Sequence, residues 1–378
     1  MKFKKLLILP IFMMLFTGCN FDVSLYTPEN NKQQNIQNTP IDSTSPTSVI
    51  NPSNYKGTIN YATHDQEELS SEEIYNLRVS SSVSIIASNN VASYLGSGVF
   101  FSEDIDDDGY AYIFTNAHLI KDTNKVEIIY SNLKRDSAIV VGYHTLEDVA
   151  VLAVRKNNNY TIPTIKTSDK LEVGSRVLTI GSPVSSEYSF LATSGIISKI
   201  DSPITSTFDS NYGLLMLQID ASLNTGNSGG PLFDKYGNLI GLNTMKLVYD
   251  NTQTAIDDFN FSIPVERAIF LANRFFNNNH YNRGLLGITI IDIIDMSLSE
   301  RTSKHINRDY GLYVYEVSQT GASNNLLLTG DIITKINGIE FSNKIPFQKE
   351  LFNYSKNESV TISIIRNNEP IDITITLK

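Results

Sequence analysis

Residues 226–232 read GNSGGPL and give Ser228 the surroundings that a nucleophile needs. A serine hydroxyl attacks a carbonyl carbon only when a base takes its proton and N–H donors stabilise the negative charge that develops. Glycines on both sides allow a sharp turn, which exposes the hydroxyl and directs neighbouring N–H groups into the same space. We therefore expect Ser228 to be a nucleophile. The oxyanion hole would use the N–H groups of Gly226 and Ser228, oriented by the peptide of Asn227.

A histidine that could take the serine proton lies in residues 114–120, FTNAHLI. His118 stands at the end of an apolar strand, where the chain enters a turn. His144, four residues before Asp148, is the alternative base, but its setting GYHT is typical of a loop at a strand end. A structural role is expected for the three remaining histidines, which are His64, His280 and His305.

An acidic residue directly before an apolar strand completes the candidate set. Residues 146–154 read LEDVAVLAV, so a carboxylate enters a buried strand at Asp148. Burying a carboxylate is costly unless a donor pairs with it, and an imidazole N–H is a suitable donor. Glu147 is the rival, but strand alternation puts Asp148 on one face with Ala150 and Leu152. Taken alone, Asp148 could also be a turn residue.

The three candidates follow the order His118, Asp148, Ser228, with intervals of 30 and then 80 residues. This is the order of the chymotrypsin type of triad, and it differs from the orders in subtilisin and the α/β-hydrolases. Short β-rich runs must position these groups, and many short strands at regular spacing predict a mainly β fold, either a barrel or a sandwich. The predicted strands are residues 83–86, 98–101, 110–114, 126–130, 139–142, 149–154, 176–180, 195–200, 214–219, 232–233 and 239–242.

Two helices are predicted at the borders of this β-rich region. The sequence SSEE at residues 70–73 is typical of a capping box, with Ile74 and Leu77 following on one helical face. Pro264 is a helix starter. The apolar residues at helical spacing after it are Val265, Ile269, Ala272, Phe275 and Phe276.

The N-terminus has the pattern of an export signal. Three lysines among the first five residues precede an apolar run at residues 6–16, which is too short to span a membrane. Small residues then precede Cys19, the only cysteine, so no intrachain disulfide is possible. The sequence TGC resembles a bacterial lipobox. We expect residues 1–18 to be a signal peptide and Cys19 to be lipidated, which would anchor the protein to the outer face of the bacterial cell membrane.

Residues 19–70 are rich in Asn, Gln, Ser, Thr and Pro and poor in aliphatic residues. Such a segment cannot bury enough apolar area to offset the entropy of ordering, so a disordered tether is expected. The whole chain has a net charge of −10, which becomes −13 when the three lysines of residues 1–18 are removed. An acidic surface disfavours binding to nucleic acid or to anionic lipids.

Residues 104–109, DIDDDG, are similar to the first half of a calcium-binding loop. The twelfth position of that loop would be Thr115, where a bidentate glutamate is required, and strands flank the segment in place of helices. We therefore expect a solvated hairpin turn. The sequence has no metal-binding cluster and no phosphate-binding loop, so neither a metal nor a cofactor is expected.

Six segments of the chain resemble the HtrA/Deg family of serine proteases. They are GSGVF at 96–100, TNAH at 115–118, DVAVL at 148–152, TGNSGGPL at 225–232, GNLIGLNT at 237–244 and FNFSIP at 259–264. The resemblance covers about residues 73–280 and implies two six-stranded barrels with the active site between them. It also implies that His118 acts as general base and then acid, that Asp148 fixes its tautomer, and that Ser228 attacks the peptide carbonyl.

The same resemblance implies the location of a substrate pocket. Ser222 stands at the expected base of the pocket in place of an aspartate, so cleavage after small or medium aliphatic residues is expected. One wall would be formed by Leu242, Asn243 and Thr244. In this family, loops at the positions of residues 201–213 and 246–260 switch the site between inactive and active arrangements.

The C-terminal part of the chain resembles a PDZ domain. The matching segments are RGLLGI at 283–288, GLYV at 311–314 and GDIITKING at 330–338, and closing strands are predicted at 360–365 and 371–377. The resemblance implies that the N–H groups of Leu286, Gly287 and Ile288 hold the C-terminal carboxylate of a peptide. The peptide would add as a strand to the edge of the sheet. The alternative is that Gly287 merely serves a tight turn.

Together, these features predict a protease domain at residues 71–280 and a PDZ domain at 281–378. The resemblance implies an extracytoplasmic serine endopeptidase that cleaves misfolded or unfolded exported proteins and forms a homotrimer through its protease domains. Two alternatives stay open. The chain could be a catalytically silent lipoprotein that binds peptides through its PDZ domain or acts as a chaperone. It could also be a narrow regulatory protease that cuts one membrane signalling protein.

Overall fold

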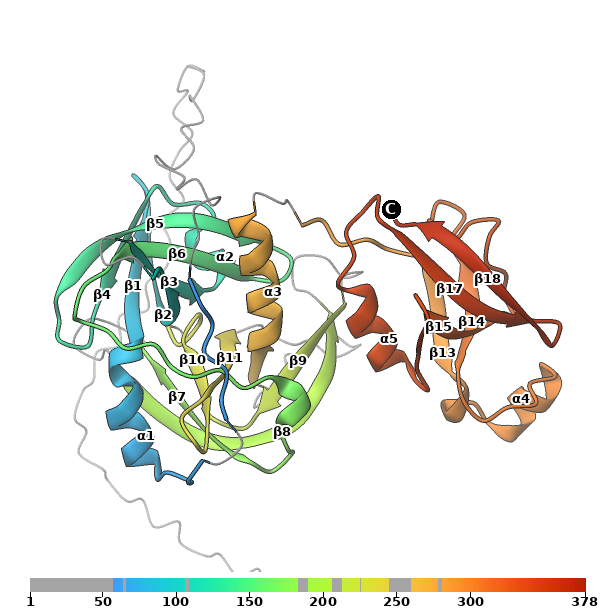
Figure 1. The fold of residues 1–378 in the computed structure, drawn as a ribbon, viewed down its shortest axis with the longest axis horizontal. Helices are drawn as coiled ribbons and strands as arrows, with labels where there is room; N and C mark the ends of the chain where they lie inside the picture. Colours follow the sequence, from blue (N-terminus) through green and yellow to red (C-terminus); the bar gives the residue numbers. More distant parts are fainter. Residues whose placement is uncertain are drawn as a thin grey trace, which may run out of the picture. The chain divides into compact units, whose positions relative to one another are not determined.

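The computed structural model describes residues 57–63, 66–105, 109–182, 190–205, 213–224, 226–244, 260–277 and 281–378 (Figure 1). The signal peptide, Cys19 and most of the predicted tether lie outside these residues, as do the tip of the acidic hairpin and most of the two expected switching loops. Within the described ranges, no helix is long and apolar enough to cross a membrane, and no group of three or more potential metal ligands occurs.

The first helix, α1 (Ser71–Arg78), begins with the predicted capping box. Ser70 Oγ accepts a hydrogen bond from Glu73 N at 3.2 Å, and Glu73 Oε2 accepts one from Ser70 N at 2.7 Å. Both contacts satisfy N–H groups that have no partner inside the helix. Ile74 is buried, whereas Leu77 is 47% exposed, so Ile74 is the residue that fastens the helix to the core.

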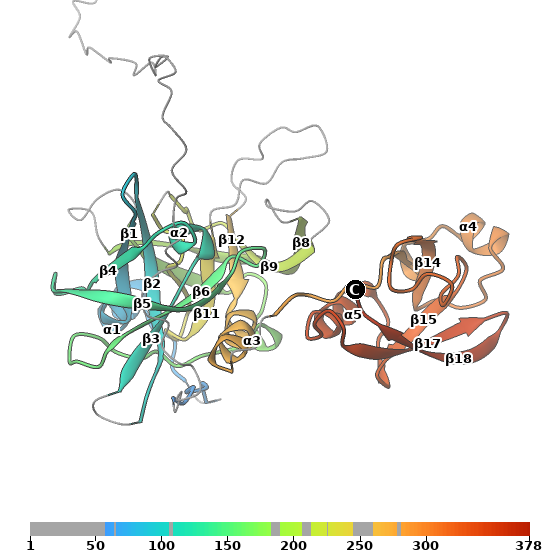
Figure 2. The same ribbon diagram turned by 90° about the horizontal axis from the view of Figure 1, so that it is seen from above.

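Two closed six-stranded barrels follow α1, with the strand orders β1-β2-β3-β6-β5-β4 and β10-β11-β12-β9-β8-β7 (Figures 1 and 2). The first barrel consists of β1 (Ser82–Ser88), β2 (Ser93–Glu103), β3 (Tyr110–Thr115), β4 (Lys125–Ile129), β5 (Arg135–His144) and β6 (Val149–Arg155). The second consists of β7 (Arg176–Gly181), β8 (Leu191–Thr205), β9 (Gly213–Ile219), β10 (Pro231–Asp234), β11 (Leu239–Thr244) and β12 (Asn260–Pro264). The prediction of a mainly β fold is confirmed. Of the two predicted architectures, barrel and sandwich, the structure has the barrel.

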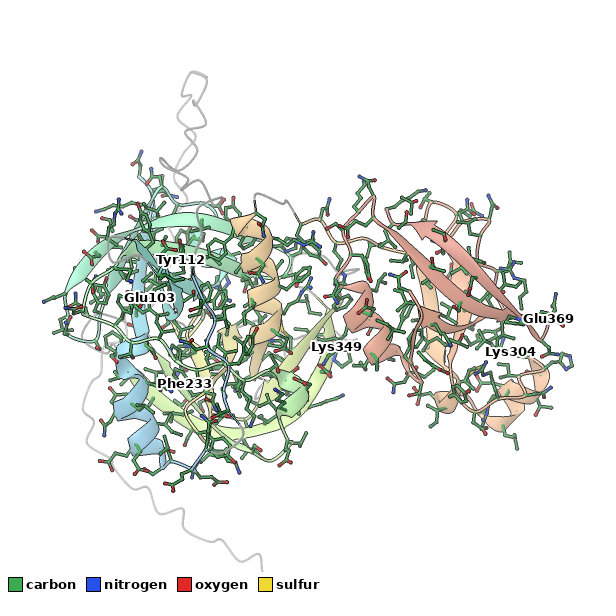
Figure 3. All side chains as sticks on the ribbon, in the orientation of Figure 1. Glu103, Tyr112, Phe233, Lys304, Lys349 and Glu369 are labelled. Atoms are coloured by element: carbon green, nitrogen blue, oxygen red, sulfur yellow. The ribbon has the colours of Figure 1, made fainter. Side chains whose placement is uncertain are left out.

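The strands β6 and β7 are buried on both faces, which explains their continuous apolar runs. In β6, Leu152 belongs to a cluster made by the first barrel, whereas Val151 belongs to a cluster that also contains residues of the second barrel and of α3. In β7 of the second barrel, Val177 belongs to a cluster of that barrel, whereas Leu178 belongs to the cluster shared by both barrels. Figure 3 shows Phe233, one of the buried aromatic side chains of the shared cluster. This shared apolar layer holds the two barrels together.

The helix α3 (Val265–Phe276) packs on the shared layer with its predicted apolar face. Pro264 is the last residue of β12 and precedes the first helical residue, one position earlier than the usual helix-starting proline. The helix lies so close to β5 that a Cβ at Gly142 would come within 2.6 Å of Phe275 Cγ. Only glycine fits at that point.

The C-terminal part forms a separate sheet with the order β13-β14-β15-β17-β18, with β16 paired to β15. Its strands are β13 (Ile288–Asp292), β14 (Leu312–Val317), β15 (Ile332–Ile336), β16 (Ile339–Glu340), β17 (Ser359–Arg366) and β18 (Glu369–Thr376). Its helices are α4 (Leu298–Ser303) and α5 (Lys344–Leu351). Asn367 and Asn368 both have positive φ, as a two-residue turn between paired strands requires. The predicted closing strands correspond to β17 and β18.

Candidate active site

His118 and Asp148 meet because the strands next to them are paired. In the antiparallel pair of β3 and β6, Thr115 lies opposite Ala150. His118 lies three residues beyond Thr115, in the short helix α2 (Ala117–Ile120), and Asp148 lies two residues before Ala150. His118 Nδ1 is 2.9 Å from Asp148 Oδ1 and 3.0 Å from Oδ2. Because a carboxylate only accepts, Nδ1 carries the proton and Nε2 is left as a base.

The carboxylate of Asp148 is fully buried, and several donors surround it. His118 N donates to Oδ1 at 3.0 Å, and Thr244 Oγ1 donates to Oδ2 at 2.8 Å. Asn116 Nδ2 donates to the backbone carbonyl of Asp148 at 2.9 Å, which holds this residue at a φ of +59°. Donors to the charged form compensate for the loss of water around a buried carboxylate.

The loop that contains Ser228 belongs to the second barrel but lies against the first. Ser97 in β2 donates from its N–H to Ser228 O at 2.9 Å and from its Oγ to Gly226 O at 2.7 Å. Gly229 has a φ of +82°, and a Cβ there would come within 2.4 Å of Thr115 Oγ1 and 3.0 Å of Asn116 N. The serine loop therefore lies beside the end of β3, which leads directly into His118.

The strand β11 (Leu239–Thr244) supports the serine loop from the other side. Gly229 N donates to Asn243 O, and Asn243 N donates to Gly230 O, both at 2.8 Å. The Asn243 side chain donates to Pro231 O at 2.8 Å and accepts from Ser262 Oγ at 2.6 Å. Consecutive residues of this strand therefore contact the nucleophile loop through Asn243 and the buried acid through Thr244.

The turn that precedes Ser228 is constrained by hydrogen bonds between its own backbone groups. Asn227 N donates to Asn224 O at 2.9 Å and so takes part in the turn itself. The Asn227 carbonyl accepts from Gly230 N at 3.0 Å. Gly226 has a φ of +98°, a conformation that favours glycine. The predicted oxyanion donors, the N–H groups of Gly226 and Ser228, belong to this same constrained turn.

His144, the alternative base, has a different role. Its Nδ1 accepts a hydrogen bond from Glu147 N at 3.1 Å, so it closes the turn between β5 and β6. Burial lowers the pKa of His144, although the Glu147 carboxylate nearby opposes this change. The imidazole that contacts Asp148 is that of His118. His305 lies in a turn after α4, and the remaining two histidines fall outside the described residues.

The four residues expected at the substrate pocket have distinct surroundings. Leu242 is buried in the layer shared by the barrels. Asn243 supports the serine loop, and Thr244 binds Asp148. Ser222 is exposed, and its carbonyl accepts a hydrogen bond from Thr193 Oγ1 at 2.8 Å. The side chains of the predicted wall thus contact the serine loop, Asp148 and the core.

The predicted carboxylate-binding loop lies at the edge of the C-terminal sheet. The carbonyls of Leu286 and Gly287 accept hydrogen bonds from Ser323 N and Ser318 N, both at 2.9 Å. Because N–H and C=O of a trans peptide point in opposite directions, the N–H groups of Gly287 and Ile288 point away from these donors. Gly287 has a φ of +72°, and a Cβ there would come within 2.5 Å of Gly321 Cα. Leu286 is buried in the domain core.

Comparisons with known proteins agree with this geometry. The family model of the trypsin-like peptidase domain matches residues 96–242, and that of the PDZ domain matches residues 284–377. The serine protease Do-like HtrA of Lactobacillus helveticus is 31% identical over 288 residues, which cover 75% of this chain and 68% of that protein. The chain belongs to the HtrA family of serine proteases.

Other HtrA proteins show the same relationship. The serine protease Do-like HtrB of Bacillus subtilis is 29% identical over 288 residues, which cover 74% of this chain and 61% of that protein. The solved structure of the HtrA-type protease AlgW with a tripeptide has a TM-score of 0.65 and 25% identity, and covers 82% of this chain and 98% of its own. The resemblance seen in the motifs is confirmed, and the chain is a serine endopeptidase with a PDZ domain.

Sequence reasoning did not identify Asn116 and Thr244 as partners of Asp148. Asn116 stands two residues before His118, in the segment TNAH. This closeness to His118 is the sequence signal that could indicate a contact with Asp148. The family resemblance places Thr244 in the pocket wall, and the sequence of a strand does not indicate which neighbouring loop its residues contact. Its separation from Asp148 is 96 residues.

Proposed function

We propose that this HtrA protein is an extracytoplasmic endopeptidase that cleaves misfolded or unfolded exported proteins with His118, Asp148 and Ser228. The observation that carries the proposal is the contact between His118 Nδ1 and the buried Asp148 carboxylate at 2.9 Å. This contact sets the tautomer in which Nε2 can accept a proton. The packing of the Ser228 loop against β2 and the end of β3 supports Ser228 as the partner.

The proposed reaction has two halves. Ser228 Oγ attacks the carbonyl carbon of the scissile bond while His118 Nε2 takes its proton, and the carbonyl oxygen becomes negatively charged. The N–H groups of Gly226 and Ser228 stabilise this oxyanion, and the Asn227 peptide orients them. The C–N bond then breaks as His118 returns the proton to the leaving amine. A water molecule, activated by His118, attacks the resulting ester, and its hydrolysis releases the new carboxylate and Ser228.

Asp148 has an electrostatic and orienting part in this scheme. It stays ionised throughout and stabilises the imidazolium that forms when His118 accepts the proton. Cleavage after small or medium aliphatic residues is proposed, with Ser222 near the base of the pocket. These steps need no cofactor, because Ser228 supplies the nucleophile, His118 transfers the protons and the backbone N–H groups stabilise the oxyanion.

The PDZ domain is proposed to bind peptide C-termini. The N–H groups of Leu286, Gly287 and Ile288 would hold the terminal carboxylate, and the peptide would add to β13 as an extra strand. Two observations support this: β13 is an edge strand of the sheet, and the carbonyls of Leu286 and Gly287 accept hydrogen bonds from Ser323 N and Ser318 N, so the next N–H groups point away from these donors.

The location and assembly of the protein are also proposed from its sequence. A signal peptide at residues 1–18 and lipidation of Cys19 would tether the protease to the outer face of the cell membrane. One relative, from Halomonas elongata, is named as a probable periplasmic serine endoprotease. A homotrimer built on the protease domains is proposed from the family resemblance. Nucleic acid is not a proposed partner, because the chain is acidic.

A fluorophosphonate probe tests the proposed nucleophile. The probe should label the wild-type chain and should not label Ser228→Ala, which lacks the attacking oxygen. His118→Ala should react far more slowly, because no base remains to take the proton. If the wild type stays unlabelled with and without an added PDZ ligand, a silent peptide-binding protein is the better description. Mapping cleavage sites across a set of unfolded proteins would then separate broad proteolysis from the cutting of one substrate.

A further inference from the structure

The residue next to the catalytic acid takes part in a buried ion pair. Arg267, on α3, donates from Nε and Nη2 to the two carboxylate oxygens of Glu147. Only 2% of the Glu147 side chain and 14% of the Arg267 side chain are exposed. A guanidinium that binds a carboxylate at two points fixes its orientation as well as its distance. The orientation of the Glu147 carboxylate is therefore fixed by the guanidinium of Arg267, which α3 carries.

We propose that Arg267 is a positioning residue for proteolysis, because it holds Glu147 and thereby fixes the turn that presents Asp148 to His118. The proposal rests on the proposed role of Asp148. Glu147 and Asp148 are consecutive, and their carboxylates bind Arg267 and His118 respectively. A rotation of the peptide between them would move both carboxylates, so a restraint on Glu147 is also a restraint on Asp148.

The turn needs such a restraint because of its backbone conformation. Asp148 has a φ of +59°, a region that residues with a side chain rarely occupy and that persists only where the surroundings impose it. From the first barrel, Asn116 Nδ2 holds the Asp148 carbonyl, and His144 Nδ1 accepts from Glu147 N. Arg267 adds a charged contact from α3, outside the strands of the barrel.

Arg267 is itself fixed on several sides. Its Nη1 donates to Phe352 O at 2.9 Å, and its Nη2 donates to Tyr281 OH at 2.8 Å. Tyr281 OH donates in turn to Phe352 O at 2.6 Å. The guanidinium carbon lies 4.4 Å from the ring centre of Phe270. These contacts restrict the movement of the guanidinium, so it can hold the Glu147 carboxylate in one position.

If the ion pair between Arg267 and Glu147 only stabilises the fold, its loss should affect the kinetics differently from the loss of a positioning contact. An ion pair that only stabilises the fold would change the fraction of folded enzyme, and turnover per active site would stay the same. An ion pair that positions Asp148 would lower kcat and leave KM nearly unchanged, because proton transfer in the transition state is impaired while substrate contacts stay intact. The two roles can therefore be separated by counting active sites before measuring rates.

The test compares Arg267→Met and Arg267→Lys with Arg274→Met in the full-length chain, using a peptide substrate and fluorophosphonate titration of active sites. Arg274 is a matched control, because it lies two turns further along α3 and binds Asn353 O at 3.2 Å, without a contact to the turn. We expect kcat of Arg267→Met to fall by about 10- to 100-fold, a smaller fall for Arg267→Lys, and wild-type kinetics for Arg274→Met. A wild-type kcat per titrated site in Arg267→Met would overturn the proposal.

A double variant covers the case in which Arg267→Met does not fold, since that change leaves a buried carboxylate without its partner. Glu147→Gln combined with Arg267→Met removes both charges. We expect this variant to fold and to lose kcat to the same extent as the single Arg267 variant, since residues that act through one contact are not additive. A folded double variant with wild-type kcat would refute the positioning role.

The result also distinguishes this proposal from the proposed function. Activity that survives Ser228→Ala at the wild-type level would refute the triad and, with it, the role of Arg267. Activity that needs Ser228 but is indifferent to Arg267 would refute only the positioning role.

Discussion

Asp148 is a carboxylate with no solvent exposure, and its oxygens accept hydrogen bonds from several donors. His118 N, His118 Nδ1 and Thr244 Oγ1 all point to its two oxygens. In the proposed triad, the same donors would hold the carboxylate in the orientation that faces the imidazole. Thr244 belongs to the second barrel, and it brings a hydroxyl to an acid of the first.

The contact with Thr244 leads to a prediction at the residue scale. Thr244→Val keeps the shape of the side chain but removes the donor, and hydrogen bonds to charged groups contribute about 1.5–3 kcal/mol. We expect the free energy of unfolding to fall by about that amount and kcat to fall by roughly 10-fold, as for loss of about 1.4 kcal/mol of transition-state stabilisation. Thermal unfolding and steady-state kinetics would measure both.

Thr244→Ser is the control, because it retains the hydroxyl and loses only a methyl group. It should behave like the wild type in kcat. Equal kinetics for Thr244→Val and Thr244→Ser would show that the hydrogen bond to Asp148 does not matter for turnover.

At the scale of elements, the turn between β5 and β6 joins Asp148, the proposed acid of the triad, to the half-buried His144. His144 Nδ1 accepts from Glu147 N, and only a neutral imidazole can accept there. The charged groups around the ring are Glu147, Arg267 and Arg283, of which the two arginines oppose a further positive charge. This turn therefore carries a group whose protonation would disturb the approach of Asp148 to His118.

His144 predicts a loss of stability at mildly acidic pH. Burial lowers its pKa in the folded state, so below the ordinary value of about 6.5 the unfolded chain binds a proton that the folded chain does not. The free energy of unfolding should then decrease as the pH falls below that value, until the folded state is protonated as well. Denaturant unfolding at a series of pH values would measure this decrease.

His144→Asn tests the assignment, since its side-chain oxygen can accept from Glu147 N but does not titrate. The variant should lose part of the decrease in stability below pH 6.5 that the wild type shows. If both proteins show the same pH dependence, another group is responsible for it.

Much of this arrangement could be predicted from the sequence, and the reasons are physical. Short strands with turn residues between them predicted the β fold, and burial on both faces of β6 explains the unbroken run VAVLAV. The pairing of His118 with Asp148 was predicted because a carboxylate that enters an apolar strand needs a donor. The glycines around Ser228 similarly indicated a sharp turn.

The contacts that were not predicted join residues far apart in the chain. Arg267 and Glu147 are separated by 120 residues, and Thr244 and Asp148 by 96. No local pattern distinguishes an arginine on a helix that binds solvent from one that binds a buried carboxylate. The packing of α3 brings Arg267 to Glu147, and the packing of the second barrel against the first brings Thr244 to Asp148.

At the scale of the whole molecule, Ser97 is the point at which the first barrel holds the serine loop of the second. Its Oγ donates to Gly226 O and accepts from Ser182 N at 2.9 Å, while its N–H donates to Ser228 O. Its carbonyl accepts from Thr115 Oγ1 at 2.8 Å. One buried residue therefore contacts both barrels and the segment that precedes His118.

Ser97→Ala should weaken both the fold and the reaction. The change removes the buried hydroxyl that binds Gly226 O and Ser182 N, and loss of a buried hydrogen-bond partner costs about 1–3 kcal/mol. We expect a lower melting temperature together with slower fluorophosphonate labelling, because the turn that precedes Ser228 loses a restraint. Differential scanning calorimetry and labelling rates would measure the two effects.

Ser80→Ala is a suitable control for that change. Within the described part of the chain, Ser80 Oγ contacts Thr161 Oγ1 in an exposed position at 2.8 Å, so its loss should alter neither quantity appreciably. A Ser97→Ala protein that labels as fast as the wild type would show that the first barrel is not needed to shape the serine loop.

The division of the candidate site between the barrels has a consequence for the order of events during synthesis. His118 and Asp148 leave the ribosome long before Ser228 and Thr244, and they have no nucleophile until β10 and β11 have joined the second barrel. The proposed base and the proposed nucleophile therefore come together only after both barrels have formed.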